Sequence, residues 1–485
     1  MKRILALSLL MIALSFTTVQ SAVAGDGAEV LFKQTLEEAQ QGNVGAQNRV
    51  AWMYAEGMGV SQNDDEAEKW YQAAIDQGDT DALYSLGKWM IEHHCDREGM
   101  DFYQRAAAKG HSMAQAQLAY YSIYGCWGTA KDYGKAMRLS QMAALEGNTR
   151  AQTNIGILYD NGYGVSEDGK KALDWFLRAA EKGNPDAQFY LGWKYERGEN
   201  VEKDPAQAVE WYTKSAALGD ADAAYNLALL YEDGNGVSRD IDQTIKWYTR
   251  SAKQGKASAR FNLGNLYSEE DGAHKDYEKA LYWFQQAEEK DHIGAINNLG
   301  WMYDNGYGVP ADEKKAFEYF LKAANSEEPY AMGNVGYTYA NGEGVKRDDE
   351  EAVRWYRRAK EARNRNAINN LGFMYEKGRG VQKDKEMAVA LYREAAEMGN
   401  PNAQRNLGVC LMKGDGVKKD LEKAYYWLYL ASLSPKAEDN QKMARLHLRT
   451  IKNSGKLSAS QMQKQENQAK KQYEIEKDWP VVPDC

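Results

Sequence analysis

Small and apolar residues of this chain recur at spacings that place them on one face of a helix. In "AQTNIGILYDN" (151–161), Ala151 and the residues four, seven and eight positions later share one side at roughly 100° per residue. A second stripe of this kind runs through "KKALDWFLRAAEKG" (170–183). The intervening "GYGVSEDG" is polar and rich in glycine, which is typical of a tight turn. The segment therefore predicts two helices joined by a turn.

This helix-turn-helix unit is repeated along most of the chain. An alanine opens each unit, and from Ala151 onward the step from one opening alanine to the next is 36 residues. The opening alanines are Ala46, Ala82, Ala114, Ala151, Ala187, Ala223, Ala259, Ala295, Ala331, Ala367 and Ala403. A fixed period in this range indicates a solenoid, in which stacked units bury stripes that no unit can bury alone. We therefore predict an all-α solenoid of about eleven units over residues 46–434.

Glycines recur in the turns between the paired helices, as at Gly162 and Gly164 or Gly306 and Gly308. A tight connection between helices needs residues that tolerate positive φ, and glycine does so without steric penalty. A phosphate-binding loop would instead follow a strand, and the pattern predicts no strand before these glycines. We therefore interpret the glycines as structural.

The two ends of a solenoid need polar caps, because each terminal unit has a neighbour on one side only. Residues 25–45 contain "EVLFKQTLEEAQQG", which predicts an N-terminal capping helix. Residues 435–485 contain two polar segments that predict C-terminal capping helices followed by a tail.

The first 24 residues have the layout of a secretory signal peptide. Lys2 and Arg3 precede a mostly apolar run over 4–19, and small residues stand at Ala22 and Ala24. The apolar run is too short to predict a transmembrane helix. We expect cleavage after Ala24 and an exported protein, either periplasmic or secreted to the cell surface or beyond.

Composition narrows the classes of partner. The chain is 43% hydrophobic and 27% charged, which is typical of a folded protein. Its formal net charge of -9 argues against nucleic acid, which attracts basic surfaces, and against a polybasic membrane-surface binder. No segment after the first 24 residues is apolar enough to predict a membrane span.

The repeat resembles the Sel1-like repeat family, short relatives of tetratricopeptide repeats. The residues that carry the resemblance are "AINNLGWMYDNGYGV" (295–309) and "QAVEWYTKSAALG" (207–219). The resemblance implies a right-handed α-superhelix that acts as an adaptor for protein partners. Exported bacterial members include a secretory immunoglobulin A-binding protein of similar size and layout. A cysteine-rich exported branch has been described as binding or hydrolysing β-lactams.

Aromatic residues gather on the side of the first helices opposite the predicted core. Counting each opening alanine as position 0, they stand at positions 2 and 6, and acidic residues stand at position 9. We call the following eight residues the aromatic ladder: Trp52, Phe189, Trp193, Tyr225, Phe261, Trp301, Tyr337 and Phe373. By analogy with the family, this side lines the concave face. Contiguous exposed aromatic residues are typical of binding hot spots. We expect a protein partner there, with host immunoglobulin A or an envelope protein as candidates.

Two alternatives to this binding surface stay open. The rings could instead pack on the helix of the next unit, and aromatic faces could also stack on the sugars of a cell-wall or host glycan. Asparagines recur at position 3, as at Asn154, Asn334 and Asn406, and their regularity favours a repeated structural hydrogen bond over a ligand-binding row.

The cysteines and histidines suggest a disulfide rather than a metal site. Cys95 and Cys126 stand at nearly the same turn position of adjacent units, which predicts a disulfide in an oxidising compartment. "EHHCD" (92–96) offers metal ligands, but adjacent histidines on a helix point in different directions. We expect neither a metal nor a cofactor.

Sequence support for catalysis is weak. "SLGK" (85–88) matches the S-x-x-K pattern of penicillin-interacting enzymes, but its Leu-Gly belongs to the repeat, and no "SDN" or "KTG" follows. The sequence therefore favours a non-enzymatic binding scaffold. A glycan-binding module and a β-lactam-processing enzyme are the alternatives.

Overall fold

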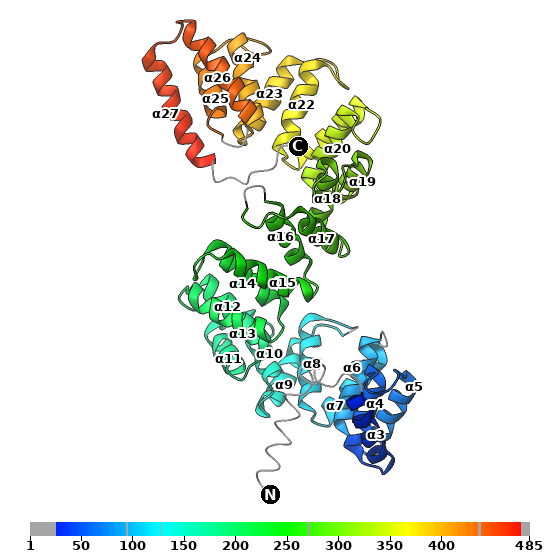
Figure 1. The fold of residues 1–485 in the computed structure, drawn as a ribbon. Coiled ribbons are helices and arrows are strands. Elements are labelled where there is room, and N and C mark those ends of the chain that lie inside the picture. Colours follow the sequence, from blue (N-terminus) through cyan, green and yellow to red (C-terminus); the bar gives the residue numbers. More distant parts are fainter. Residues whose placement is uncertain (1–25, 94–95, 128, 270–271, 435–437, 477–485) are drawn as a thin grey trace. The chain divides into compact units, whose positions relative to one another are not determined.

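The computed structural model describes residues 26–93, 96–127, 129–269, 272–434 and 438–476. Throughout these residues the chain forms 25 α-helices and no strand, which confirms the predicted all-α repeat solenoid. It divides into two compact units, residues 1–254 and 255–485, each a stack of paired antiparallel helices (Figure 1). The predicted signal peptide lies outside the described residues, as does Cys95.

The first unit contains thirteen of these helices. They are α3 (Asp26–Gln40), α4 (Val44–Glu56), α5 (Asp64–Asp76), α6 (Thr80–Glu92), α7 (Asp96–Ala108), α8 (Ser112–Tyr124), α9 (Tyr133–Leu145), α10 (Thr149–Asp160), α11 (Gly169–Glu181), α12 (Pro185–Arg197), α13 (Pro205–Ala217), α14 (Ala221–Asp233) and α15 (Ile241–Lys253). From α4 onward the even-numbered helices are the first helices of the repeats and the odd-numbered ones are the second helices.

The second unit contains the remaining twelve. They are α16 (Ala257–Ser268), α17 (Tyr277–Glu288), α18 (Ile293–Asn305), α19 (Glu313–Asn325), α20 (Pro329–Asn341), α21 (Asp349–Glu361), α22 (Arg365–Lys377), α23 (Lys385–Glu397), α24 (Pro401–Lys413), α25 (Leu421–Ala431), α26 (Glu438–Asn453) and α27 (Ala459–Glu476). The alternation of first and second helices continues up to α25.

Local sequence sets where each helix begins and ends. At α12, Asn184 Oδ1 accepts a hydrogen bond from the Ala187 backbone N–H at 2.9 Å, and Pro185 occupies the first turn. The helix ends at Gly198, whose φ of 74° is left-handed and whose N–H donates to the Lys194 carbonyl. Most other first helices repeat this arrangement, so the period of the sequence becomes a period of helix boundaries.

Within a repeat, a glycine lets the two helices approach closely. Gly300 in α18 faces the ring of Phe320 in α19, and a methyl group at Gly300 would lie 2.6 Å from that ring. Phe320 itself is 3% exposed. Glycine is required here because a methyl group at that distance would collide with the buried ring.

The turn glycines have positive φ, as predicted, and a second role that conformational freedom does not explain. Gly308 has a φ of +69°, and a side chain there would overlap the Tyr277 carbonyl at the start of α17. Gly344 stands in the same relation to Glu313, and Gly380 to Asp349. Each turn is therefore seated on the second helix of the preceding repeat.

The position 3 asparagines join neighbouring repeats. Asn334 donates its side-chain amide to Asn297 Oδ1 at 3.1 Å, and Asn406 donates to Asn369 Oδ1 at 3.0 Å. Asn154 donates to the backbone carbonyl of Ala116 at 2.9 Å. These bonds support the structural interpretation of the asparagine row.

Helices outside the repeats cover both ends of the array. In the first unit α3 packs on α4, and in the second unit α26 and α27 both pack on α25. Tyr425 donates its hydroxyl to Glu466 of α27 at 2.7 Å, and Asn440 of α26 donates to the Pro401 carbonyl at 3.0 Å. Across the described ranges, no helix is both long enough and apolar enough to cross a membrane.

Candidate functional site

The aromatic ladder occupies first helices in both units: α4, α12 and α14 in the first, and α16, α18, α20 and α22 in the second. Seven of its eight residues are half-buried, and Phe373 is 39% exposed. This partial exposure fits both a binding surface and rings packed between helices. The binding role of the ladder as a whole therefore stays a prediction, and its members differ in their surroundings.

The position 2 rings of the ladder pack on the chain itself. The ring centroid of Phe189 lies 5.8 Å from that of Tyr212 on α13, and Tyr225 lies 5.5 Å from Tyr248 on α15. Phe261 stacks on His292 with the ring centroids 4.5 Å apart. For these three residues the contacts favour the packing interpretation, because one face of each ring is already covered by the protein.

The position 6 rings have fewer ring contacts of this kind. Trp193 carries the guanidinium of Arg197 over its ring at 3.6 Å, and Lys377 lies 5.4 Å from the Phe373 ring. The ring centroid of Trp301 lies 4.7 Å from that of Tyr307, a residue of the turn that follows α18. These partners are flexible surface side chains or turn residues, so the position 6 rings are the better candidates for contact with another molecule.

Most of the position 9 carboxylates, expected to surround the ladder, have hydrogen-bond partners within the protein. Glu196 accepts from the Tyr212 hydroxyl at 2.8 Å, and Glu376 accepts from Tyr392 at 2.8 Å. Glu232 accepts from Tyr248 at 2.6 Å. Burial, followed by the charge of Glu196, raises the pKa of Tyr212, which keeps the phenol protonated as the donor. These acids brace the two helices of a repeat.

Asp304 differs from these glutamates because its repeat has Phe320 where the others have tyrosine. Phenylalanine has no hydroxyl, and no hydrogen bond or ion pair from the described residues reaches the Asp304 carboxylate. Burial, followed by the charge of Glu313, raises the pKa of Asp304. The same effect, with Asp304 and Glu313 as its charged neighbours, raises the pKa of Glu343.

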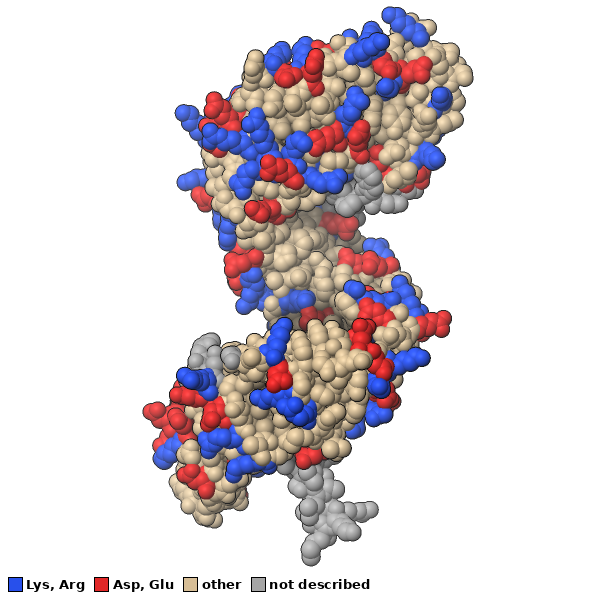
Figure 2. All heavy atoms as spheres, turned by 180° about the vertical axis from the view of Figure 1, so that it is seen from behind, with Lys and Arg blue, Asp and Glu red and all other residues tan. Residues whose placement is uncertain are grey.

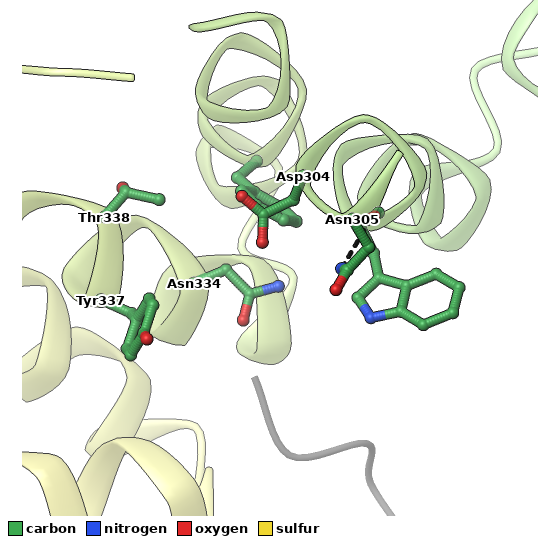
Figure 3. Close-up of a pocket in the computed structure, with 7 residues that line it drawn as sticks. Asp304, Asn305, Asn334, Tyr337 and Thr338 are labelled. Atoms are coloured by element: carbon green, nitrogen blue, oxygen red, sulfur yellow. Dashed lines mark hydrogen bonds between the residues drawn. The ribbon is translucent and has the colours of Figure 1, made fainter. Parts of the chain in front are cut away.

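A small pocket opens at Asp304, between α18 and α20 (Figure 3). Its lining consists of Trp301, Asp304, Asn305, Phe320, Asn334, Tyr337 and Thr338. Its volume is about 60 Å³, far below the several hundred Å³ of a typical cofactor site. The pocket therefore suits one side-chain terminus, and two ladder residues, Trp301 and Tyr337, form part of its wall.

A second aromatic series, which our sequence interpretation missed, lies on the second helices. Trp211 has the ammonium of Lys214 over its ring at 4.0 Å, and Trp355 has the guanidinium of Arg358 at 4.3 Å. The signal in the sequence is tryptophan followed three residues later by lysine or arginine, again with a period of 36 residues. Arg250 of this series also donates to the Ala217 carbonyl of the preceding second helix at 2.8 Å, which ties adjacent repeats.

The surface charge is mixed. On the face drawn in Figure 2, basic and acidic side chains are interspersed over each unit, and this face has no large area of one sign. The basic residues that follow the second-helix tryptophans are partly engaged by those rings. This side of the molecule therefore offers no basic track of the kind that nucleic acid requires.

The remaining sequence candidates give no second site. Lys88 Nζ lies 3.6 Å from Glu92 on an exposed helix face, which pairs the lysine of "SLGK" with a carboxylate. Over the described ranges no group of histidine, cysteine and acidic residues could hold a metal. Neither Cys126 nor Cys410 forms a disulfide with another described residue. Because Cys95 lies outside the described residues, the Cys95–Cys126 disulfide stays a prediction.

The model of one known protein family matches most of the chain. The model of the Sel1 repeat matches eleven segments: 44–79, 96–111, 112–148, 149–184, 185–220, 221–256, 257–292, 293–327, 329–364, 365–400 and 401–434. A Sel1-like repeat-containing protein of Acanthamoeba polyphaga mimivirus is 26% identical over 128 residues. That match covers 26% of this chain and 23% of the viral protein.

A solved structure of another protein shows the same architecture. The crystal structure of a protective antigen present in uropathogenic Escherichia coli strains, with an SLR fold, superposes with a TM-score of 0.68 at 29% identity. The superposition covers 94% of this chain and 98% of that antigen. A Sel1 repeat protein from Oxalobacter formigenes is 31% identical, with a TM-score of 0.48 over 64% of this chain and 89% of its own.

Proposed function

The chain belongs to the Sel1 repeat family, and from that premise we propose that it is an exported, non-enzymatic scaffold that binds a protein partner through its aromatic ladder. Repeat scaffolds of this kind generally mediate interactions between proteins. The observation that carries the proposal is the run of partly exposed rings at Trp301, Tyr337 and Phe373, on α18, α20 and α22 of one unit. Large rings at the surface are the usual anchors of a protein interface.

Export and a host partner are the finer part of this proposal. The first 24 residues have the layout of a signal peptide. The structurally similar protein is described as a protective antigen of uropathogenic Escherichia coli strains, which supports testing host proteins as partners. Host immunoglobulin A is therefore the first partner to test, with an envelope protein of the producing cell as the second.

The experiment is an affinity capture with three forms of the protein lacking residues 1–24. The forms are the wild type, a ladder variant carrying Trp301→Ala, Tyr337→Ala and Phe373→Ala, and a control carrying Tyr282→Ala and Tyr330→Ala. Tyr282 and Tyr330 are 53% and 40% exposed and lie outside the ladder. Circular dichroism and thermal melting establish that the three forms are equally folded before use.

Each form is exposed to envelope extract and to host secretions containing secretory immunoglobulin A, and retained proteins are identified by mass spectrometry. We expect a protein that wild type and control retain and the ladder variant loses. Equal retention by the ladder variant would reject the ladder as the binding site. Release of the captured species by soluble sugars would instead favour the glycan-binding alternative.

A further inference from the structure

Two repeats of the chain end their first helices with the same residues. "YDNGYGV" begins at Tyr159 and again at Tyr303, 144 residues later, which is four repeat periods. The helices themselves, α10 and α18, begin at residues 149 and 293, with the same offset. Asp160 and Asp304 are therefore equivalent aspartates at the ends of equivalent helices, and the following repeat supplies different residues to each of them.

At Asp160 the neighbouring repeat supplies a cation. Lys194 of α12 places its Nζ 2.6 Å from Asp160 Oδ1, and the lysine side chain is 1% exposed. Glu199 lies 3.8 Å from the same ammonium. A buried lysine is stable only when its charge is paired, so the Asp160 carboxylate and the Lys194 ammonium define a built ammonium site in this fold.

At Asp304 the neighbouring repeat supplies no cation. The residue equivalent to Lys194 is Thr338, whose hydroxyl donates to the Val335 carbonyl at 2.9 Å within its own helix. Threonine is several atoms shorter than lysine, and Thr338 lines the pocket at Asp304 instead of filling it. Figure 3 shows Asp304, Asn334 and Thr338 arranged around this space.

The walls of the pocket suit an ammonium group. Trp301 and Tyr337 are among the residues that line the pocket, and aromatic rings attract cations that approach their faces. Asp304 contributes a carboxylate that is held at a partly buried site close to Glu313 and Glu343, so a cation there would relieve repulsion among three acids. Phe320 closes one side and, unlike the tyrosines of other repeats, donates no hydrogen bond to the acid.

We propose that this pocket binds the ammonium group of a lysine side chain on the partner protein, with Asp304 as its counter-ion and with Trp301 and Tyr337 among the residues that line it. The inference rests on the proposed function, because it assigns one anchor point of the same partner. Lysine is preferred to arginine for two reasons. The equivalent site holds a lysine of the chain itself, and a volume of about 60 Å³ suits a compact head better than a planar guanidinium.

The test uses small probes that mimic one residue, so that no partner need be known. N-acetyl-lysine amide is titrated into the protein labelled with ¹⁵N-tryptophan, and N-acetyl-norleucine amide is the uncharged control of similar shape. The indole N–H signal of Trp301 is assigned with a Trp301→Phe variant. We expect a saturable shift of this signal with the lysine probe and none with norleucine. Equal shifts with both probes, or no saturable shift with lysine, would overturn the proposal.

Two variants of the chain make the test specific. Thr338→Lys recreates the internal pair seen at Asp160, so it should abolish binding of the lysine probe without lowering the melting temperature. Asp304→Asn keeps the shape and removes the charge, and it should weaken binding at least about tenfold, since a charge-assisted bond is lost. Unchanged binding in either variant would overturn the proposal, and tighter binding of N-acetyl-arginine amide would reassign the site to guanidinium.

The outcome is separable from that of the affinity capture. If the ladder variant loses a partner and the lysine probe causes no saturable shift of the Trp301 signal, the proposed function stands and this pocket is rejected. A specific lysine response together with equal capture by the ladder variant would show that the pocket accepts an ammonium group, but it would reject both the ladder and this pocket as the surface that holds the partner.

Discussion

Tyr212 lies so close to Gly192 that a methyl group at Gly192 would be 2.5 Å from the Cδ1 atom of the ring. The ring is fully buried, and its hydroxyl reaches across to Glu196 at 2.8 Å. One glycine therefore sets the distance between α12 and α13 and also lets the tyrosine reach its acceptor. The same contact joins Gly372 to Tyr392, whose hydroxyl bonds to Glu376.

We predict that Gly192→Ala destabilises the protein by about 1–2 kcal/mol, because overpacking against a buried ring outweighs the better helix propensity of alanine. The matched control is Gly45→Ala in α4, where a methyl group would have its nearest neighbour at 3.7 Å. Urea unfolding followed by circular dichroism measures both. The prediction is wrong if the two variants are equally stable.

The amide bond between Asn369 and Asn406 should couple two repeats energetically. Each single alanine variant should lower the free energy of unfolding by about 1 kcal/mol, because a half-buried amide loses its partner. The double variant should lose less than the sum of the two, with a coupling of about 0.5–1 kcal/mol in a double-mutant cycle. A cycle between Asn369 and the distant Asn154 should give no coupling, and equal coupling in both cycles would contradict this account.

Asp304→Asn should stabilise the protein at neutral pH. The pKa of Asp304 is raised above its ordinary value of 3.8 by burial and by Glu313, so the folded state disfavours the charged form relative to the unfolded state. The free-energy penalty for ionising Asp304 in the folded state is absent below the unfolded pKa. It grows as the pH rises from the unfolded to the folded pKa, and it is complete above the folded pKa. Thermal melting should therefore show a higher melting temperature for the variant at pH 7 and a smaller difference at pH 4. A lower melting temperature at pH 7 would show that the carboxylate has a stabilising partner.

The buried pair of Lys194 and Asp160 should respond asymmetrically to substitution. Lys194→Met replaces the ammonium with the residue that α18 and α22 have at this position, Met302 and Met374, and should cost only about 1 kcal/mol, because the Asp160 carboxylate left behind is 21% exposed and can be hydrated. Asp160→Ala leaves the ammonium with only Glu199 nearby and should cost about 1–3 kcal/mol. Chemical unfolding at pH 7 measures the free energy of unfolding of both variants. Equal losses in the two variants would contradict this prediction.

The repeat period predicted the helices because most first-helix boundaries have a local cause, such as the cap at Asn184 or the left-handed Gly198. The candidate site could be predicted only in part. Trp301 and Tyr337 were found from their spacing, but Asp160 and Asp304 sit in identical heptapeptides, and no local pattern separates them. What separates them is Lys194 against Thr338, in the following repeat. That contact depends on how one helix is stacked on the next, which the periodicity alone does not specify.

The close contact between each of these turn glycines and the preceding second helix has a consequence for how such chains evolve. Gly308, Gly344 and Gly380 use the same kind of seam, against Tyr277, Glu313 and Asp349. Because the glycine contacts a backbone carbonyl, the contact does not depend on which side chain the residue of the preceding helix carries. Recombination could therefore add or remove a whole 36-residue cassette without creating an unfamiliar junction, and the spacing of surface anchors would become a heritable trait that changes in fixed steps.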